Sequence, residues 1–122
     1  MPGIFGLISK RSKEVNEKEL SLMQKTLNTE GFYSAGKYIL DDMCVYIGWT
    51  CHKGSFSDCL PVMNETKDIA LIYFGENFCD SEDFDELKRR HHRFERTNCS
   101  YLVHMYEEWG EKFLTRLNIF LY

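Results

Sequence analysis

Runs of apolar residues spaced by polar ones predict several strands and three helices. The chain opens on an apolar stretch, residues 1–8, which we expect to form a buried strand. Residues 38–40 and 43–50 predict two further strands joined by the acidic turn Asp41-Asp42, and residues 51–67 predict a loop. The strongest strand pattern covers residues 69–74. A short strand at residues 92–96 could follow.

Helical periodicity appears in three places. Asn16 resembles an N-cap, and Leu20, Met23 and Leu27 recur at helical spacing after it, so we expect a helix over residues 16–29. Asp80 or Ser81 begins a second helix that ends in basic residues. A third runs from residue 100 to about 109, where Gly110 ends it.

The C-terminal residues predict one more turn and the start of a strand. Phe113, Leu114 and Leu117 fit a further helical turn, and residues 118–122 are extended in pattern. A strand that starts where the sequence stops favours a natural unit that continues beyond Tyr122. The 122 residues are enough for one domain, or for a large part of one.

Charge and hydropathy indicate which binding partners and which cellular compartment to expect for this chain. The net charge is −4, and the basic residues are scattered, so nucleic acid is not an expected partner. No apolar run approaches the length of a membrane span, and no signal peptide is visible, so a cytoplasmic protein is expected.

The cysteine and histidine residues do not form a recognisable metal motif. The five cysteines are odd in number and irregularly spaced, which favours reduced thiols. Cys51, His52 and Cys59 could ligate a metal together, but core thiols are the commoner outcome. The pair His91-His92 lies among arginines and is expected to be a solvated surface run, so no metal site is predicted.

A strand at the very start of a chain has one known catalytic use. It can carry an N-terminal nucleophile that its own α-amino group activates. Pro2 has no thiol or hydroxyl group, so the residues themselves favour a strand that simply starts early.

Four stretches resemble the class-II glutamine amidotransferase domain of asparagine synthetases, in order and spacing along nearly the whole chain. These stretches are Met-x-Gly-Ile-Phe-Gly-Leu-Ile at the start, Ile72-Tyr73-Phe74-Gly75-Glu76-Asn77, residues 94–100 and residues 106–118. The resemblance implies an α+β protein with the layered αββα fold of the N-terminal nucleophile hydrolases, of which residues 1–122 would be the N-terminal part.

The chemistry of that family does not carry over to this sequence. The family attacks the glutamine amide with a Cys at the position of Pro2. Its oxyanion-binding Asn is replaced by Phe74, which leaves Gly75 and Glu76 as the remnants of the glutamine site. The family's glutamine-binding Arg residues are missing from residues 29–34 and 48–53, and its acidic residue from residues 97–100.

These departures favour a degenerate, non-hydrolytic domain that serves as a scaffold for an asparagine-synthetase-like amide ligase. No cofactor is expected in this domain, while the resemblance implies ATP and magnesium in a linked synthetase domain. Two alternatives stay open. One is an enzyme of altered chemistry that uses an exposed Pro2 amine, and the other is a stand-alone interaction module, such as a homodimer that covers an incomplete sheet.

Overall fold

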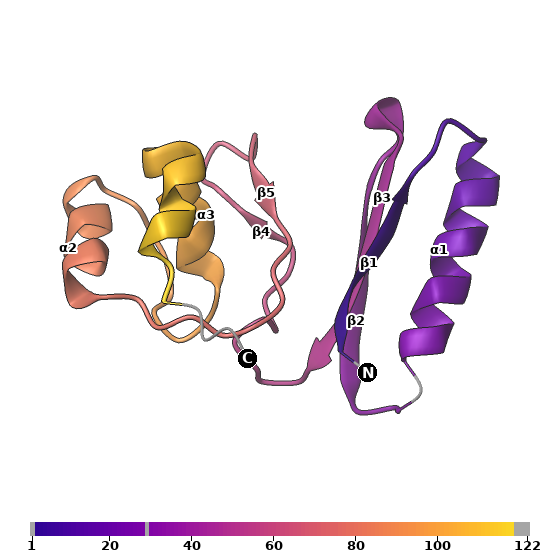
Figure 1. The fold of residues 1–122 in the computed structure, drawn as a ribbon, viewed down its shortest axis with the longest axis horizontal. Helices are drawn as coiled ribbons and strands as arrows, with labels where there is room; N and C mark the ends of the chain where they lie inside the picture. Colours follow the sequence, from indigo (N-terminus) through magenta and orange to yellow (C-terminus); the bar gives the residue numbers. More distant parts are fainter. Residues whose placement is uncertain (1, 29, 119–122) are drawn as a thin grey trace. The chain divides into compact units, whose positions relative to one another are not determined.

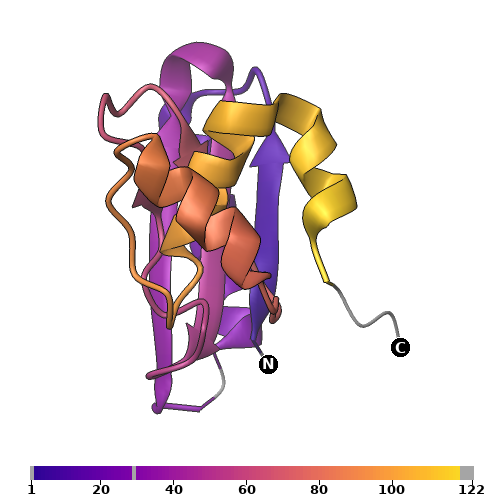
Figure 2. The same cartoon turned by 90° about the vertical axis from the view of Figure 1, so that its left-hand side faces the viewer.

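The computed structural model describes residues 2–28 and 30–118, which form a mixed arrangement of helices and strands (Figures 1 and 2). The α+β class expected from the sequence is therefore confirmed. The chain divides into two compact units, unit 1 (residues 1–58) and unit 2 (residues 59–122), and each is described by itself.

Unit 1 is a three-stranded antiparallel sheet with one helix against it (Figure 1). The central strand is β3 (Val45–His52), with β1 (Gly3–Ile8) on one side and β2 (Tyr33–Leu40) on the other. The expected hairpin is confirmed, although β2 begins at Tyr33 and the acidic turn is the 3-10 segment η1 (Asp41–Met43).

The first strand is exposed along one face, so the expectation that it is buried is wrong in part. Side chains on a strand alternate between two faces, and Ile4 and Ile8 are 45% and 82% exposed. Phe5 and Leu7 share the other face with Tyr46, which interacts with Asn16 of the helix. The apolar run at the start therefore belongs to a sheet that the helix covers on one side.

Helix α1 (Lys13–Leu27) begins three residues earlier than its sequence pattern suggested. Its N-cap is Ser12, whose Oγ accepts a hydrogen bond from the main-chain N–H of Val15 (3.3 Å). Asn16 is not the cap but is fully buried, and its Nδ2 donates to the carbonyl oxygens of Ser9 (3.2 Å) and Arg11 (3.0 Å). Asn16 therefore fixes the loop between β1 and α1.

Unit 2 has a short hairpin and two helices. Strands β4 (Val62–Met63) and β5 (Ala70–Leu71) are antiparallel, and helix α2 (Ser81–Arg89) follows with Asp80 as its N-cap. Helix α3 (Ser100–Trp109) ends at Gly110, where the chain changes direction into the 3-10 segment η2 (Gly110–Arg116; Figure 2). Both predicted helices are confirmed.

Three expectations about unit 2 are corrected. Residues 69–74 form a strand only at Ala70–Leu71, because their partner β4 is two residues long and the ladder ends with it. The predicted loop of residues 51–67 contains β4. Residues 92–96 form no strand, and Phe94 instead stacks on Phe84 of α2 with ring centroids 5.6 Å apart.

The core of unit 2 is built mainly by the first half of α3. Tyr101, Leu102, Val103 and Met105 are buried, as is Leu87 of α2. Nothing is inferred for the strand predicted at residues 118–122, because residues 119–122 lie outside the described residues. No helix in the described part of the chain combines the length and the apolar character needed to cross a membrane.

Candidate functional site

The residues that the resemblance places at a nucleophile position and at a glutamine-binding position fall in different units. Pro2 lies directly before β1 in unit 1 and is half-buried. Gly75 and Glu76 follow β5 in unit 2, where Gly75 has a positive φ of 134° and Glu76 is exposed. Tyr73 Oη donates to the main-chain carbonyl of Glu76 (3.3 Å), so a local hydrogen bond closes this turn.

The segment around Gly75 offers no asparagine amide in the role that the family requires. Phe74 is 48% exposed and has no polar side-chain atom. The nearby Asn77 is buried, and its Nδ2 donates to Tyr101 Oη (2.9 Å). The amide of Asn77 therefore binds the core of unit 2 rather than pointing to solvent.

The two segments that lack the expected arginines bring aromatic rings together in unit 1. The imidazole of His52 stacks on Phe32, with ring centroids 6.3 Å apart, and makes an edge-to-face contact with Tyr33, with centroids 5.0 Å apart.

Cys51 is buried, with Sγ 3.8 Å from Oδ1 of Asp58. A hydrogen bond from the Gly54 N–H holds the pKa of Asp58 below its ordinary value.

Unit 2 contains a histidine–glutamate cluster that the sequence patterns did not predict. Each member offers one ligand atom, and these atoms lie within 4.8 Å of one another. The four residues, called the His/Glu cluster below, are Glu65, His92, His104 and Glu107. In the part of the chain that the structure describes, these four residues are the one set of histidine, cysteine and acidic side chains that lie close enough together to hold a metal ion.

Three elements supply the His/Glu cluster. Glu65 comes from the loop between β4 and β5, and His92 from the segment after α2. His104 and Glu107 are three residues apart on α3, so they lie on one face of that helix. The cluster therefore joins a loop, a connecting segment and a helix of the same unit.

The two histidines are both buried and face the same carboxylate. His92 and His104 side chains are 6% and 4% exposed. Nδ1 of His92 is 3.5 Å from Oε1 of Glu65, and Nδ1 of His104 is 3.4 Å from Oε2 of Glu65. His91 is exposed as expected, but the assignment of His92 to a solvated surface run is wrong, because its ring packs against His104.

A further set of polar groups orients the His/Glu cluster. His92 Nε2 is 2.6 Å from Oε1 of Glu108, and Asn64 Nδ2 donates to Oε2 of Glu107 (2.8 Å). Burial lowers the pKa of His104, against the attraction of Glu65. The hydrogen bond with His92 holds the pKa of Glu108 below its ordinary value. The lowered pKa of His104 favours its neutral form, and the lowered pKa of Glu108 favours its ionised form.

The only sequence signal for this cluster was weak. His104 and Glu107 have a spacing that places two ligands on one helical face. Glu65 and His92 come from irregular segments, whose positions no periodicity predicts. The cluster therefore could not be assembled without the fold.

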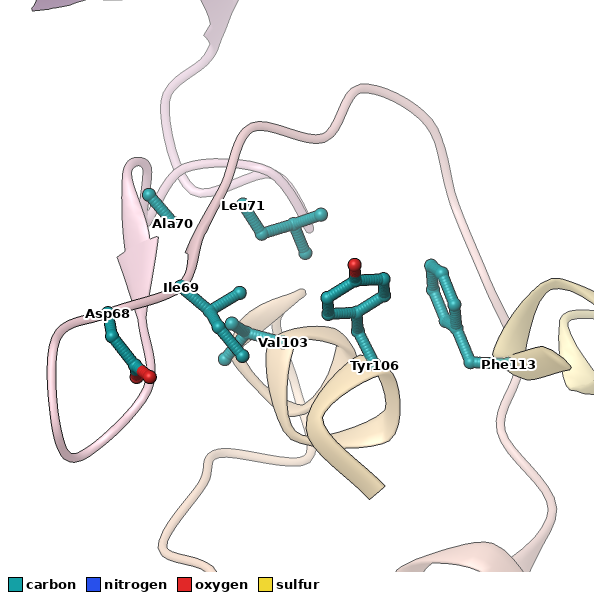
Figure 3. Close-up of a pocket in the computed structure, with 7 residues that line it drawn as sticks. All are labelled: Asp68, Ile69, Ala70, Leu71, Val103, Tyr106 and Phe113. Atoms are coloured by element: carbon teal, nitrogen blue, oxygen red, sulfur yellow. The ribbon is translucent and has the colours of Figure 1, made fainter. Parts of the chain in front are cut away.

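Unit 2 also contains an apolar hollow of about 470 Å³ beside α3 (Figure 3). Ile69 and Leu71 approach it from the hairpin, and Tyr106 and Phe113 stand across from them. The rings of Tyr106 and Phe113 meet edge to face, with centroids 5.7 Å apart. Asp68 is the one charged residue that lines the hollow, so it offers little polar recognition.

Comparisons of the chain with protein-family profiles, with curated proteins and with solved structures found no match.

Proposed function

We propose that this chain is a non-hydrolytic, glutamine amidotransferase-like domain that acts as a scaffold or docking domain for an asparagine-synthetase-like amide ligase. The observation that carries the proposal is Pro2, which stands directly before β1 where the resembling family has its nucleophile. A prolyl side chain cannot attack an amide. The proposal is that the family's fold is kept while its reacting atom is missing.

The surroundings of the remnant site support the same proposal. A hydrolytic site needs a donor for the tetrahedral oxyanion, and loss of one donor costs about 10²- to 10³-fold in rate. Phe74 has no such donor, and the amide of Asn77 is engaged by Tyr101. His52 lies in a segment in which the resembling family has a glutamine-binding Arg, and here its ring contacts Phe32 and Tyr33.

The sheet of unit 1 agrees with the proposed αββα fold. It starts with the N-terminal strand and is covered on one face by α1. A layered fold of this kind would place a second sheet on the other face, where Ile4 and Ile8 are exposed. Residues 1–122 would then be its N-terminal part.

The proposed partner is a ligase that activates a carboxylate with ATP and magnesium. Without a glutaminase site, the ligase would use an amine other than released ammonia. Closure of a peptide macrolactam is one such reaction, whereas asparagine formation would need ammonia from another source. The cytoplasm is the proposed compartment, because an odd number of irregularly spaced cysteines favours reduced thiols.

The proposal is tested by assaying the untagged chain with L-glutamine and following glutamate by NMR. We expect no turnover in the wild type or in Pro2→Cys, because restoring the thiol does not restore the missing donors. Turnover by the wild type would overturn the proposal, and turnover by Pro2→Cys would show that the rest of the site is intact. Co-purification with a synthetase encoded in the same or a neighbouring reading frame is the expected positive result, and the absence of any adenylate-forming ligase there would contradict it.

Two alternatives make different predictions. If Met1 is removed, the secondary amine of Pro2 could act as a base or form an iminium with a carbonyl compound, and mass measurement of the N-terminus tests this. An interaction module or homodimer is favoured by the exposed rings of Phe74 and Phe78. Light scattering at high protein concentration distinguishes a homodimer from a monomer.

A further inference from the structure

We infer that the His/Glu cluster of unit 2 is a binding site for one divalent transition-metal ion, of which Zn²⁺ is the best fit. Its donors would be the Nδ1 atoms of His92 and His104 and one carboxylate oxygen each from Glu65 and Glu107. This inference is independent of the proposed scaffold function. It concerns what holds unit 2 together.

The hydrogen bonding of His104 leaves one ring nitrogen available to an ion. Nδ1 of His104 is buried and has no hydrogen-bond partner. The ring also forms a hydrogen bond with the main chain of Arg93, and this bond must use the other nitrogen, Nε2. In a neutral imidazole whose Nε2–H donates, Nδ1 holds a lone pair. The Nδ1 atom that carries this lone pair lies 3.4 Å from Oε2 of Glu65.

His92 repeats the arrangement. Its Nε2 lies 2.6 Å from Oε1 of Glu108, and a carboxylate can only accept, so the proton is on Nε2. Nδ1 lies 3.5 Å from Oε1 of Glu65, where it can coordinate an ion when it carries no proton. A histidine that donates one N–H to a carboxylate and ligates with the other nitrogen is the usual carboxylate–histidine–metal arrangement.

The spacing of the acceptor atoms fits a shared cation. The lone pair on Nδ1 of His104 faces Oε2 of Glu65, and the two repel each other unless a proton or a cation lies between them. In a tetrahedral site with bonds of about 2.0–2.1 Å, neighbouring ligand atoms are about 3.3 Å apart. The two nitrogen–oxygen distances of 3.5 and 3.4 Å are close to this value, but they run to the two different oxygens of Glu65. The four donor atoms lie within 4.8 Å of one another, so binding of one ion requires them to move closer together.

The remaining donor is also oriented. Oε2 of Glu107 accepts a hydrogen bond from Asn64 Nδ2, and the Oδ1 of Asn64 accepts from the N–H groups of Asp68 (3.1 Å) and Ile69 (3.0 Å). The loop that carries Glu65 is thereby tied to α3. Glu65 and Glu107 are exposed, which gives an ion a route from solvent.

The chemistry of the donors selects the ion. Two imidazoles and two carboxylates suit Zn²⁺ and its first-row neighbours better than Mg²⁺ or Ca²⁺, which prefer oxygen ligands alone. Four protein ligands from three segments are typical of a structural site. Binding would therefore stabilise unit 2.

The test uses the full untagged chain, freed of metal with a chelator and titrated with Co²⁺ and then Zn²⁺. Tetrahedral Co²⁺ absorbs strongly in the visible, unlike aqueous Co²⁺, so the spectrum reports the site directly. We expect one Co²⁺ per chain, displacement by Zn²⁺, and a higher thermal unfolding midpoint with Zn²⁺. We expect Glu107→Gln and His92→Asn each to weaken binding by at least about 10- to 100-fold, the loss that is typical even of residues that only orient a ligand.

The matched control is His91→Asn, the same change at the exposed neighbouring histidine, which should bind as the wild type does. If circular dichroism shows that His92→Asn does not fold, the exposed Glu107→Gln carries the comparison. Three results would overturn the inference: no visible Co²⁺ spectrum in the wild type, equal loss in His91→Asn, or a thiolate-to-Co²⁺ charge-transfer band, which would place the ion on cysteines.

Discussion

The phenol of Tyr101 and the side-chain amide of Asn77 are held together by reciprocal hydrogen bonding. Asn77 Nδ2 donates to Tyr101 Oη (2.9 Å), and Tyr101 Oη donates to the main-chain carbonyl of Asn77 (3.2 Å). Both residues are buried. The segment that follows Gly75 and Glu76 is therefore fastened to the start of α3.

Tyr101→Phe is expected to lower the free energy of unfolding by about 1–3 kcal/mol, because it leaves the buried Asn77 Nδ2 without its partner while the ring is kept. Urea-unfolding midpoints measure the change. Tyr106→Phe, at an exposed position of the same helix, should alter the midpoint little. An equal effect of the two changes would show that the hydrogen bonds to Asn77 contribute nothing of their own.

The close approach of Gly36 and Trp49 gives a prediction for unit 1. A Cβ atom at Gly36 would lie 2.4 Å from Cζ2 of the Trp49 ring, which is buried beside it. Gly36→Ala should therefore destabilise the protein by about 1–3 kcal/mol, because the ring or the strand must move. Gly3→Ala is the control, since a Cβ there meets no atom within 4 Å. Thermal unfolding that responds equally to both changes would refute the steric argument.

The loop between β1 and α1 depends on a buried amide. Asn16→Ala removes the donor to the carbonyls of Ser9 and Arg11 and should lower the free energy of unfolding by about 1–3 kcal/mol. Lys18→Ala, at an exposed position of the same helix, is the control. Hydrogen exchange should also show faster opening of this loop in Asn16→Ala. Unchanged exchange and stability would contradict the role given to Asn16.

Cys79 is predicted to be a poor nucleophile. Burial, helped by Asp83 and Asp80, raises the pKa of its thiol to about 12 from 9.0. Since the thiolate is the reactive form, alkylation at pH 8 should be slower by about two to three orders of magnitude than for an unstructured peptide thiol. Raising the pH from 8 to 10 should accelerate it steadily, without a plateau. Mass spectrometry of iodoacetamide-treated protein, native and in urea, measures the rate, and equal rates in the two states would disprove the prediction.

The helices could be predicted from the sequence because their signals are local. The spacing of apolar residues and the stop at Gly110 identify α3 as Ser100–Trp109, and Asp80 was correctly expected at the start of α2. The hairpin of β2 and β3 was also foreseen, since a short acidic turn joins two extended runs. The predicted start of α1 was wrong by three residues. Asn16 could serve as an N-cap or as a buried residue within the helix, and the sequence alone does not distinguish these two roles.

The strands depended on partners that the sequence does not reveal. Residues 69–74 have a strong strand pattern, yet pairing stops after Leu71 because β4 supplies only two residues. Residues 92–96 were expected to be extended, and their side chains instead pack on α2 and α3.

By itself, the sequence determined the helices, the hairpin and the absence of a nucleophilic side chain at Pro2, all of which are properties of neighbouring residues. Only the tertiary structure decided which face of β1 meets α1 and that His92 is buried beside His104, with Glu65 between their Nδ1 atoms. The contacts of Glu65 with His92 and His104 join segments that are separated along the chain. Their positions depend on how the loops close, and no periodic pattern encodes that.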